Sequence, residues 1–160
     1  MIRTVLMTTT ALMIATSAFA QETKVKEVDV TTEITAIGNE KAAAYWVNVD
    51  TDLEAAILAR LVDRIGEEGS KISVDIDELT LANSFESKLG LEDAVMVGKV
   101  NVSSETDNAK FDGYELTVTA KTAQAFAADG TALVTEFVGS PEYYAALVAA
   151  FADGVVTRLK

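Results

Sequence analysis

The stretch from Thr51 to Gly69 (TDLEAAILARLVDRIGEEG) constrains the fold more than any other part of the chain. Its apolar residues recur at steps of three and four, which places their side chains on one side of a helix. These residues are Leu53, Ile57, Leu58, Leu61, Val62 and Ile65. Because Arg60, Asp63 and Glu67 fall on the opposite side, the sequence predicts an amphipathic helix over residues 51–69 with one buried face.

Both ends of this stretch carry signals that start or stop a helix. Asp50, Thr51 and Asp52 have side-chain oxygens that cap the free amides of a first turn, and acidic residues suit the positive end of the helix dipole. Gly66 or Gly69 can adopt the left-handed conformation that ends a helix. We therefore expect the helix to fill most of this stretch.

Alternating apolar and polar residues predict strands on both sides of the helix. The alternation runs over residues 28–37, 72–77 and 114–121, and residues 95–102 form a further strand with apolar side chains on both sides. Gly38-Asn39 and the stretch 43–49 predict a hairpin with the first strand, with a helix over 40–45 as the alternative. After Ile76 the apolar parity changes, which indicates a bulge or a bend near Glu78.

The last third of the chain adds a strand and a helix. Ala128-Asp129-Gly130 is typical of a hairpin turn and leads into an expected strand over 131–138. Ser140 followed by Pro141 favours a helix start, because proline is tolerated at the first helical position. The predicted buried stripe of this last helix is Tyr144, Leu147, Val148, Phe151, Val155 and Leu159.

This order of elements predicts an α+β fold. We expect a two-layer sandwich in which a largely antiparallel sheet of about five to six strands packs against two helices on one face. Residues 21–160 are long enough for one such domain.

Residues 1–20 have the pattern of a secretory signal peptide. Arg3 precedes a short apolar stretch, and Ala18-Phe19-Ala20 places small residues before a cleavage position. No later stretch has the length and apolarity of a membrane span, so we expect no stable membrane insertion. The predicted location is the periplasm, with secretion as the alternative.

Composition excludes several classes of function. The chain has no histidine and no cysteine, which argues against the usual zinc sites, against nucleophile systems that need either residue, and against disulfides. Its net charge of −12 argues against binding to nucleic acid. We therefore predict no enzyme activity, no catalytic residue and no cofactor.

Three groups of residues are candidates for sites. Asn48, Asp50 and Asp52 have the spacing that begins a calcium loop, but Leu53 replaces the required glycine and Ala59 the required acid, so we predict no metal site. Asp75 and Asp77 share one strand face and are expected to be solvated rather than catalytic. The aromatic pairs Tyr45-Trp46 and Tyr143-Tyr144 favour core packing over stacking on a sugar or peptide.

The last helix offers a candidate partner face. The side opposite its buried stripe is predicted to carry small residues and one charge, in contrast to the acidic remainder of the surface. These residues are Ala146, Ala149, Ala150, Asp153, Val156 and Thr157. The alternative is that the alanines only supply helix propensity on a solvated face.

A predicted first helix with the sequence LEAAILARLVDRI is followed by KISVDIDELTL, by antiparallel strands and by a closing helix. In this order of elements the chain resembles small periplasmic α/β sandwich proteins of the lipopolysaccharide-assembly lipoprotein type. That resemblance implies a role in the cell envelope, although the lipid-bearing cysteine of those proteins is missing here. Together these observations predict an exported, non-catalytic domain that binds an envelope protein, a second copy of itself or a small ligand. A carboxylate-only enzyme and a small-ligand carrier are the alternatives.

Overall fold

The computed structural model describes residues 23–32, 46–80, 95–105, 111–127 and 141–159. These residues form four strands, three α-helices and two short 3-10 helices. The elements in chain order are β1 (Val25–Thr32), α2 (Val49–Arg60), η2 (Val62–Arg64), β2 (Ser70–Thr80), β3 (Val95–Ser103), β4 (Asp112–Thr119), α4 (Ala120–Ala123), η4 (Gln124–Phe126) and α5 (Pro141–Arg158).

The four strands form one mixed sheet in the order β1-β2-β3-β4. β1 pairs with β2 in parallel, with Val28 opposite Ile72, whereas β2–β3 and β3–β4 are antiparallel. A parallel pair needs a crossover connection, and the segment containing α2 lies in it. The predicted hairpin between residues 28–37 and 43–49 is therefore wrong where the structure describes it, because Val49 begins α2 instead of ending a strand.

The predicted bulge in β2 is confirmed. The register between β2 and β3 shifts between Ile76 and Glu78, so Asp77 is the additional residue on β2. The shift changes which side chains face the core, as the parity change in the sequence indicated.

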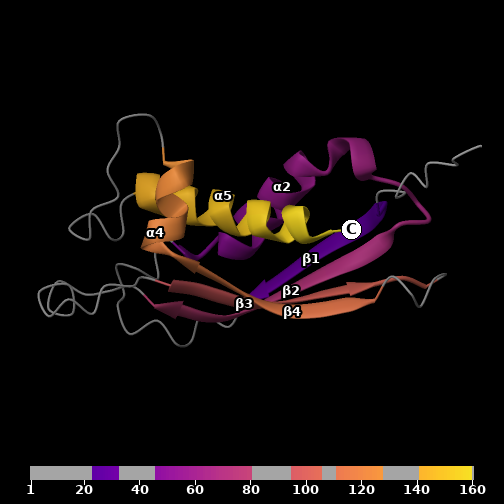
Figure 1. The fold of residues 1–160 in the computed structure, drawn as a ribbon, viewed down its shortest axis with the longest axis horizontal. Coiled ribbons are helices and arrows are strands. Elements are labelled where there is room, and N and C mark those ends of the chain that lie inside the picture. The colour runs from indigo at the N-terminus through magenta and orange to yellow at the C-terminus, as the bar shows by residue number, and fades with distance from the viewer. Residues whose placement is uncertain (1–22, 33–45, 81–94, 106–110, 128–140, 160) are drawn as a thin grey trace, which may run out of the picture.

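The helices α2 and α5 cover one face of the sheet, and the other face is bare of any described helix (Figure 1). The core lies between these two layers. Its largest fully buried side chains include Trp46, Leu53, Ile57, Leu61, Ile72, Met96, Tyr143, Leu147 and Phe151. The α+β class and the arrangement of helices on one face are thus as predicted, but the described residues give four strands and three α-helices instead of five to six strands and two helices.

The first long helix is shorter than its apolar spacing predicts. α2 ends at Arg60, and Ile65 has an extended backbone that forms a parallel bridge with Val25 of β1. Leu53, Ile57 and Leu61 are buried, but Val62 is 70% exposed and Ile65 is 46% exposed. The contact with β1, which the local pattern does not encode, therefore ends the helix early.

The connection after α2 ties the two ends of the described domain together. The amide of Gly66 donates to the Val25 carbonyl over 3.0 Å. The Arg64 guanidinium donates to the carbonyl of Thr23 over 3.0 Å and to that of Leu159 over 3.4 Å. One side chain thus joins the start of β1 to the end of α5.

α5 is a central member of the helical layer. It contacts α2, α4, η4, β3 and β4, so it buries more than one stripe of side chains. Leu147, Val148, Phe151 and Val155 are buried as predicted, and Tyr144 and Leu159 are partly buried. Gly154 allows the helix to approach β4, since a Cβ there would lie 3.0 Å from the Leu116 side chain.

A short helix follows β4 directly and was not predicted. Thr119 and Thr122 form a reciprocal capping box at the start of α4, in which the Thr119 hydroxyl accepts from the Thr122 amide. Leu116 and Val118 of β4 are buried and Glu115 and Thr117 are exposed, as the alternation predicted. The signal peptide, the alternative helix over 40–45, the turn at 128–130 and the strand over 131–138 lie outside the described residues.

Candidate functional site

The acidic residues at the start of α2 make contacts within the domain. Asn48 takes the N-cap position without a side-chain capping bond. Asp50 accepts a hydrogen bond from the Thr51 amide over 2.8 Å, and Asp52 accepts one from the Tyr144 hydroxyl of α5. Within the described ranges, no group of three or more acidic residues could hold a metal ion.

Three members of the two predicted aromatic pairs, Trp46, Tyr143 and Tyr144, pack in the core or against it. Trp46 and Tyr143 are buried, which confirms the packing interpretation for these two, and Tyr45 lies outside the described residues. Tyr144 meets Trp46 edge to face, with 5.1 Å between ring centroids. Burial raises the pKa of the Tyr144 hydroxyl, and its hydrogen bond to the Asp52 carboxylate raises it further. These side chains connect α2 to α5 and do not form an open stacking surface.

The predicted partner face of α5 is smaller than expected. Ala146 and Ala150 are buried, so the prediction that they lie on the surface is wrong. α5 packs against neighbours on several sides, and a helix in that position buries small residues outside its main stripe. Ala149, Asp153 and Val156 are partly exposed and, of the six residues, only Thr157 is exposed, which leaves a narrow strip.

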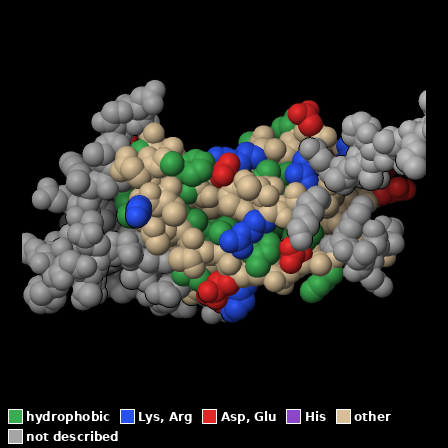
Figure 2. Space-filling view, viewed as in Figure 1, with side chains coloured by type: hydrophobic (Ala, Val, Ile, Leu, Met, Phe, Trp, Pro, Cys, Tyr) green, Lys and Arg blue, Asp and Glu red, His purple; other side chains and the backbone are tan. Residues whose placement is uncertain are grey.

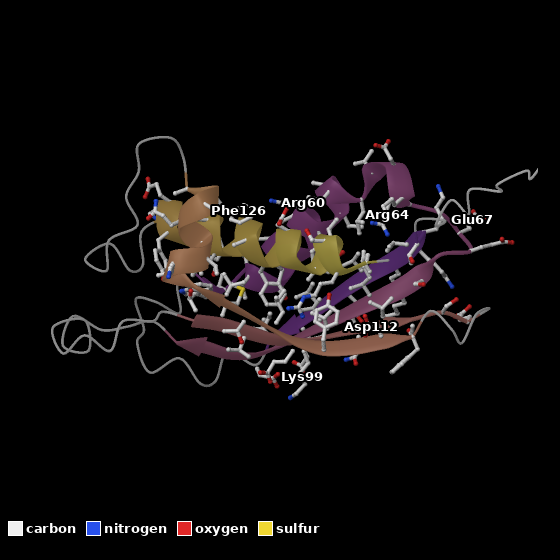
Figure 3. All side chains as sticks on the ribbon, viewed as in Figure 1. Arg60, Arg64, Glu67, Lys99, Asp112 and Phe126 are labelled. Atoms are coloured by element: carbon white, nitrogen blue, oxygen red, sulfur yellow. The ribbon has the colours of Figure 1, made fainter. Side chains whose placement is uncertain are left out.

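α2 contributes a cation to this strip. The Arg60 guanidinium donates to the Ala149 carbonyl over 3.2 Å and to the Ala56 carbonyl over 3.0 Å. Figure 3 shows Arg60 and Arg64 in the helical layer, on the side of the sheet opposite to Lys99. The strip is therefore bordered by a charged side chain that already bonds the α5 backbone.

The sheet has an outer face, the outer sheet face, which we define as the strand side chains that point away from the helices. Its members are Glu27, Asp29, Thr31, Lys71, Ser73, Asp75, Asp77, Val97, Lys99, Asn101, Ser103, Glu115 and Thr117. Five carboxylates and two lysines give this face a net negative charge. Asp75 and Asp77 are exposed on it, as the sequence predicted.

Both lysines of the outer sheet face are paired with carboxylates. Lys99 Nζ lies 2.8 Å from Asp77 Oδ1, and Lys71 Nζ lies 2.9 Å from Glu27 Oε1 and 3.1 Å from Asp29 Oδ2. The hydrogen bond to Asp77 raises the pKa of Lys99, and the hydrogen bonds to Glu27 and then Asp29 raise the pKa of Lys71. Acidic and basic side chains lie side by side at the lower margin of the described surface (Figure 2).

One end of the outer sheet face is hollowed. This sheet-end hollow has a volume of about 200 Å³ and lies where β1 and β2 begin and β3 ends. It is lined by Lys26, Glu27, Gly69, Lys71, Ser103, Ser104 and Glu105. The lateral row Glu27, Lys71 and Ser103 forms part of it, because these three residues are partners in the register.

Glycine and a second ion pair shape the hollow. A Cβ on Gly69 would lie 2.5 Å from the backbone of Val25 and Lys26, so only glycine fits this approach of β2 to β1. Across the hollow, Lys26 Nζ lies 3.4 Å from Glu105 Oε2. Sequence reasoning did not group these residues as a site, since no local motif joins positions 26, 69 and 105.

Comparison with known proteins does not show the family of this chain. No family model matches the chain, and no curated protein matches it. Among solved structures, a PelC dodecamer from Paraburkholderia phytofirmans is similar with a TM-score of 0.40 and 12% sequence identity, covering 84% of this chain and 86% of that chain. A similarity at that TM-score carries no functional inference, and the resemblance to assembly lipoproteins stays a prediction.

None of the helices in the described ranges has the length and apolarity needed to cross a membrane.

Proposed function

We propose that this chain is an exported, non-catalytic domain of the cell envelope that holds a partner protein on its outer sheet face. The observation that carries the proposal is the placement of both long helices on one face of the sheet, which leaves the other face without cover from any described helix. An exposed sheet face of charged side chains provides a broad contact surface.

The charge of this face supports a partner with a basic surface. Both lysines are already paired with carboxylates, while Asp75 and Glu115 flank Lys99 without an ion pair of their own among the described residues. A basic partner would gain attraction from these carboxylates, and this attraction should weaken as salt rises.

The same geometry supports a binding role over a carboxylate-only enzyme. Asp75 and Asp77 lie on an exposed strand face, whereas a catalytic acid pair is expected in a concave site that excludes water. The absence of histidine and cysteine removes the commonest general bases and nucleophiles.

A pull-down from periplasmic extract with tagged mature protein tests the proposal. In one variant, Asp75→Asn, Asp77→Asn and Glu115→Gln together neutralise the outer sheet face. In the matched control, Asp63→Asn, Glu67→Gln and Glu142→Gln remove the same charge from the helical side. We expect the first variant to lose a partner that the wild type and the control retain, and we expect recovery to fall with salt.

Equal recovery of all partners by both triple variants would show that the outer sheet face is not the contact surface. A further variant, Ala149→Arg, tests the narrow strip on α5, where self-association or partner docking was expected from the sequence. If this variant alone loses the partner, or loses dimer mass in light scattering, the contact surface lies on the helical layer instead.

A further inference from the structure

The sheet-end hollow brings opposite charges together in an ordered arrangement. Lys26 comes from β1, Lys71 from β2 and Glu105 from the segment after β3, so the site is built from three separate parts of the chain. Two ammonium groups and two carboxylates line it, together with the serines at 103 and 104. A ligand in this hollow therefore meets both positive and negative groups within one small space.

Both kinds of charged group have hydrogen-bonding capacity left. An ammonium group donates up to three hydrogen bonds, and Lys71 uses two of them on Glu27 and Asp29. Lys26 makes one longer contact of 3.4 Å with Glu105, whose side chain is 87% exposed. Each carboxylate accepts several hydrogen bonds, so Glu105 retains acceptor sites that face solvent.

The size of the hollow limits what it can hold. Sites for drug-sized ligands measure roughly 300 to 1,000 Å³. At about 200 Å³ the sheet-end hollow is smaller than these, and it fits a compound of amino-acid size.

We propose that the sheet-end hollow binds a small zwitterion of the free amino acid class. The carboxylate of the ligand accepts hydrogen bonds from Lys26 and Lys71, and its ammonium group donates to Glu105. The hollow shares Glu27, Lys71 and Ser103 with the outer sheet face, but the proposal does not rest on the partner protein proposed above, so the failure of one proposal leaves the other intact.

Ligands whose charge is all of one sign fit less well. A dianion such as phosphate would approach Lys71 but would be repelled by Glu27, Asp29 and Glu105. A divalent cation would be repelled by the two ammonium groups that line the hollow. A ligand with both charges satisfies both sets of groups at once.

The test is titration of the isotope-labelled mature protein, with amide chemical shifts as the readout. Glycine and L-alanine are the zwitterionic probes, and N-acetyl-alanine, alanine amide and inorganic phosphate are the probes that lack one charge. We expect the zwitterions to shift the amides of Lys26, Gly69 and residues 103–105, with a dissociation constant on the order of millimolar because the ion pairs are solvated. The probes whose charge is all of one sign should bind at least about tenfold more weakly.

Variants on the same face make the result specific. Lys71→Gln and Glu105→Gln should each weaken zwitterion binding by about tenfold or more, since each removes one of the charged contacts. Lys99→Gln is the matched control, because it breaks an ion pair of the same kind on the outer sheet face but outside the hollow. The affinity of Lys99→Gln for the zwitterions should equal that of the wild type.

Three outcomes would overturn the proposal. One is the absence of shifts at the hollow with either zwitterion at about ten times the expected dissociation constant. Another is equal binding of the probes whose charge is all of one sign. The third is an equal loss of affinity in Lys99→Gln and Lys71→Gln, which would indicate a general effect of surface charge.

Discussion

Gly98 lies at the crowded point where β3, the β2 bulge and α5 meet. A Cβ at this position would lie 2.9 Å from Ile76 Cδ1 and 3.0 Å from both the Asp75 carbonyl oxygen and Phe151 Cζ. We predict that Gly98→Ala lowers the free energy of unfolding by about 1 to 3 kcal/mol, because the backbone and the core must shift to admit the methyl group. Urea unfolding measures the change.

Gly113→Ala is the control for this substitution. Gly113 also lies in the sheet, but it is exposed and its added Cβ would meet only the Asn101 side chain, 3.3 Å away, which can move. We expect little change in stability there. Equal losses in the two variants would show that alanine destabilises these strands for a reason other than crowding.

Tyr114 gives stability a dependence on high pH. Burial raises the pKa of its hydroxyl to about 12, although Arg158, whose guanidinium carbon lies 4.7 Å from the ring centroid, lowers it in part. The unfolded chain loses this proton near pH 10, so between about pH 10 and 12 the folded state binds more protons than the unfolded state. The stabilisation is complete below this range and is lost as the pH rises through it.

We predict that the free energy of unfolding falls less steeply over this range in Tyr114→Phe than in the wild type. Urea unfolding at several pH values measures both slopes, and the raised pKa of Tyr144 accounts for part of the slope that remains. Identical slopes in the two proteins would mean that Tyr114 ionises as freely in the folded state as in the unfolded state.

At the scale of elements, α2 and the residues that follow it show which part of the predicted apolar stripe packs in the core. Leu61 is fully buried at the end of α2, and the adjacent Val62 is 70% exposed. We predict that Leu61→Ala costs about 2 to 5 kcal/mol of unfolding free energy, because it leaves a cavity in the core, whereas Val62→Ala costs little. Thermal or urea unfolding distinguishes them, and similar effects at both positions would contradict the packing described here.

Sequence patterns predicted the elements whose structure depends on residues that are close together in the sequence. The alternation in β4 and the parity change before Glu78 were enough to place a half-buried strand and a bulge. The end of α2 was not predictable in this way, since Val62 and Ile65 continue the helical spacing. Ile65 leaves the helix to bridge Val25, about 40 residues earlier, and no window of sequence contains both residues.

The candidate sites were even less predictable from the sequence, because they too depend on contacts between distant residues. Alanine is compatible with a solvated helix face and with close packing, so the sequence of α5 could not show that Ala146 and Ala150 are buried. The sheet-end hollow depends on the parallel register that places Lys71 beside Glu27, and on the return of the chain at Glu105. These neighbours are determined by topology, which single-sequence patterns do not specify.

At the scale of the whole molecule, the predicted export has a direct chemical test. We predict cleavage after Ala20, because Ala18 and Ala20 are small and follow a short apolar stretch. The intact mass of the exported protein should correspond to residues 21–160, with or without cyclisation of Gln21. A periplasmic protein that still carries residues 1–20 would contradict the prediction.

The parallel pairing of β1 with β2 also affects how the nascent chain folds. A chain that leaves the ribosome N-terminus first presents β1 well before β2, the strand with which β1 pairs in parallel. Until β2 has emerged, the valines of β1 have no sheet to pack on and can associate with other unfinished chains. Lys26, Glu27 and Asp29 interrupt that apolar run, and charges in such positions oppose aggregation. The charged residues of β1 therefore protect the growing chain before they contribute to any folded surface.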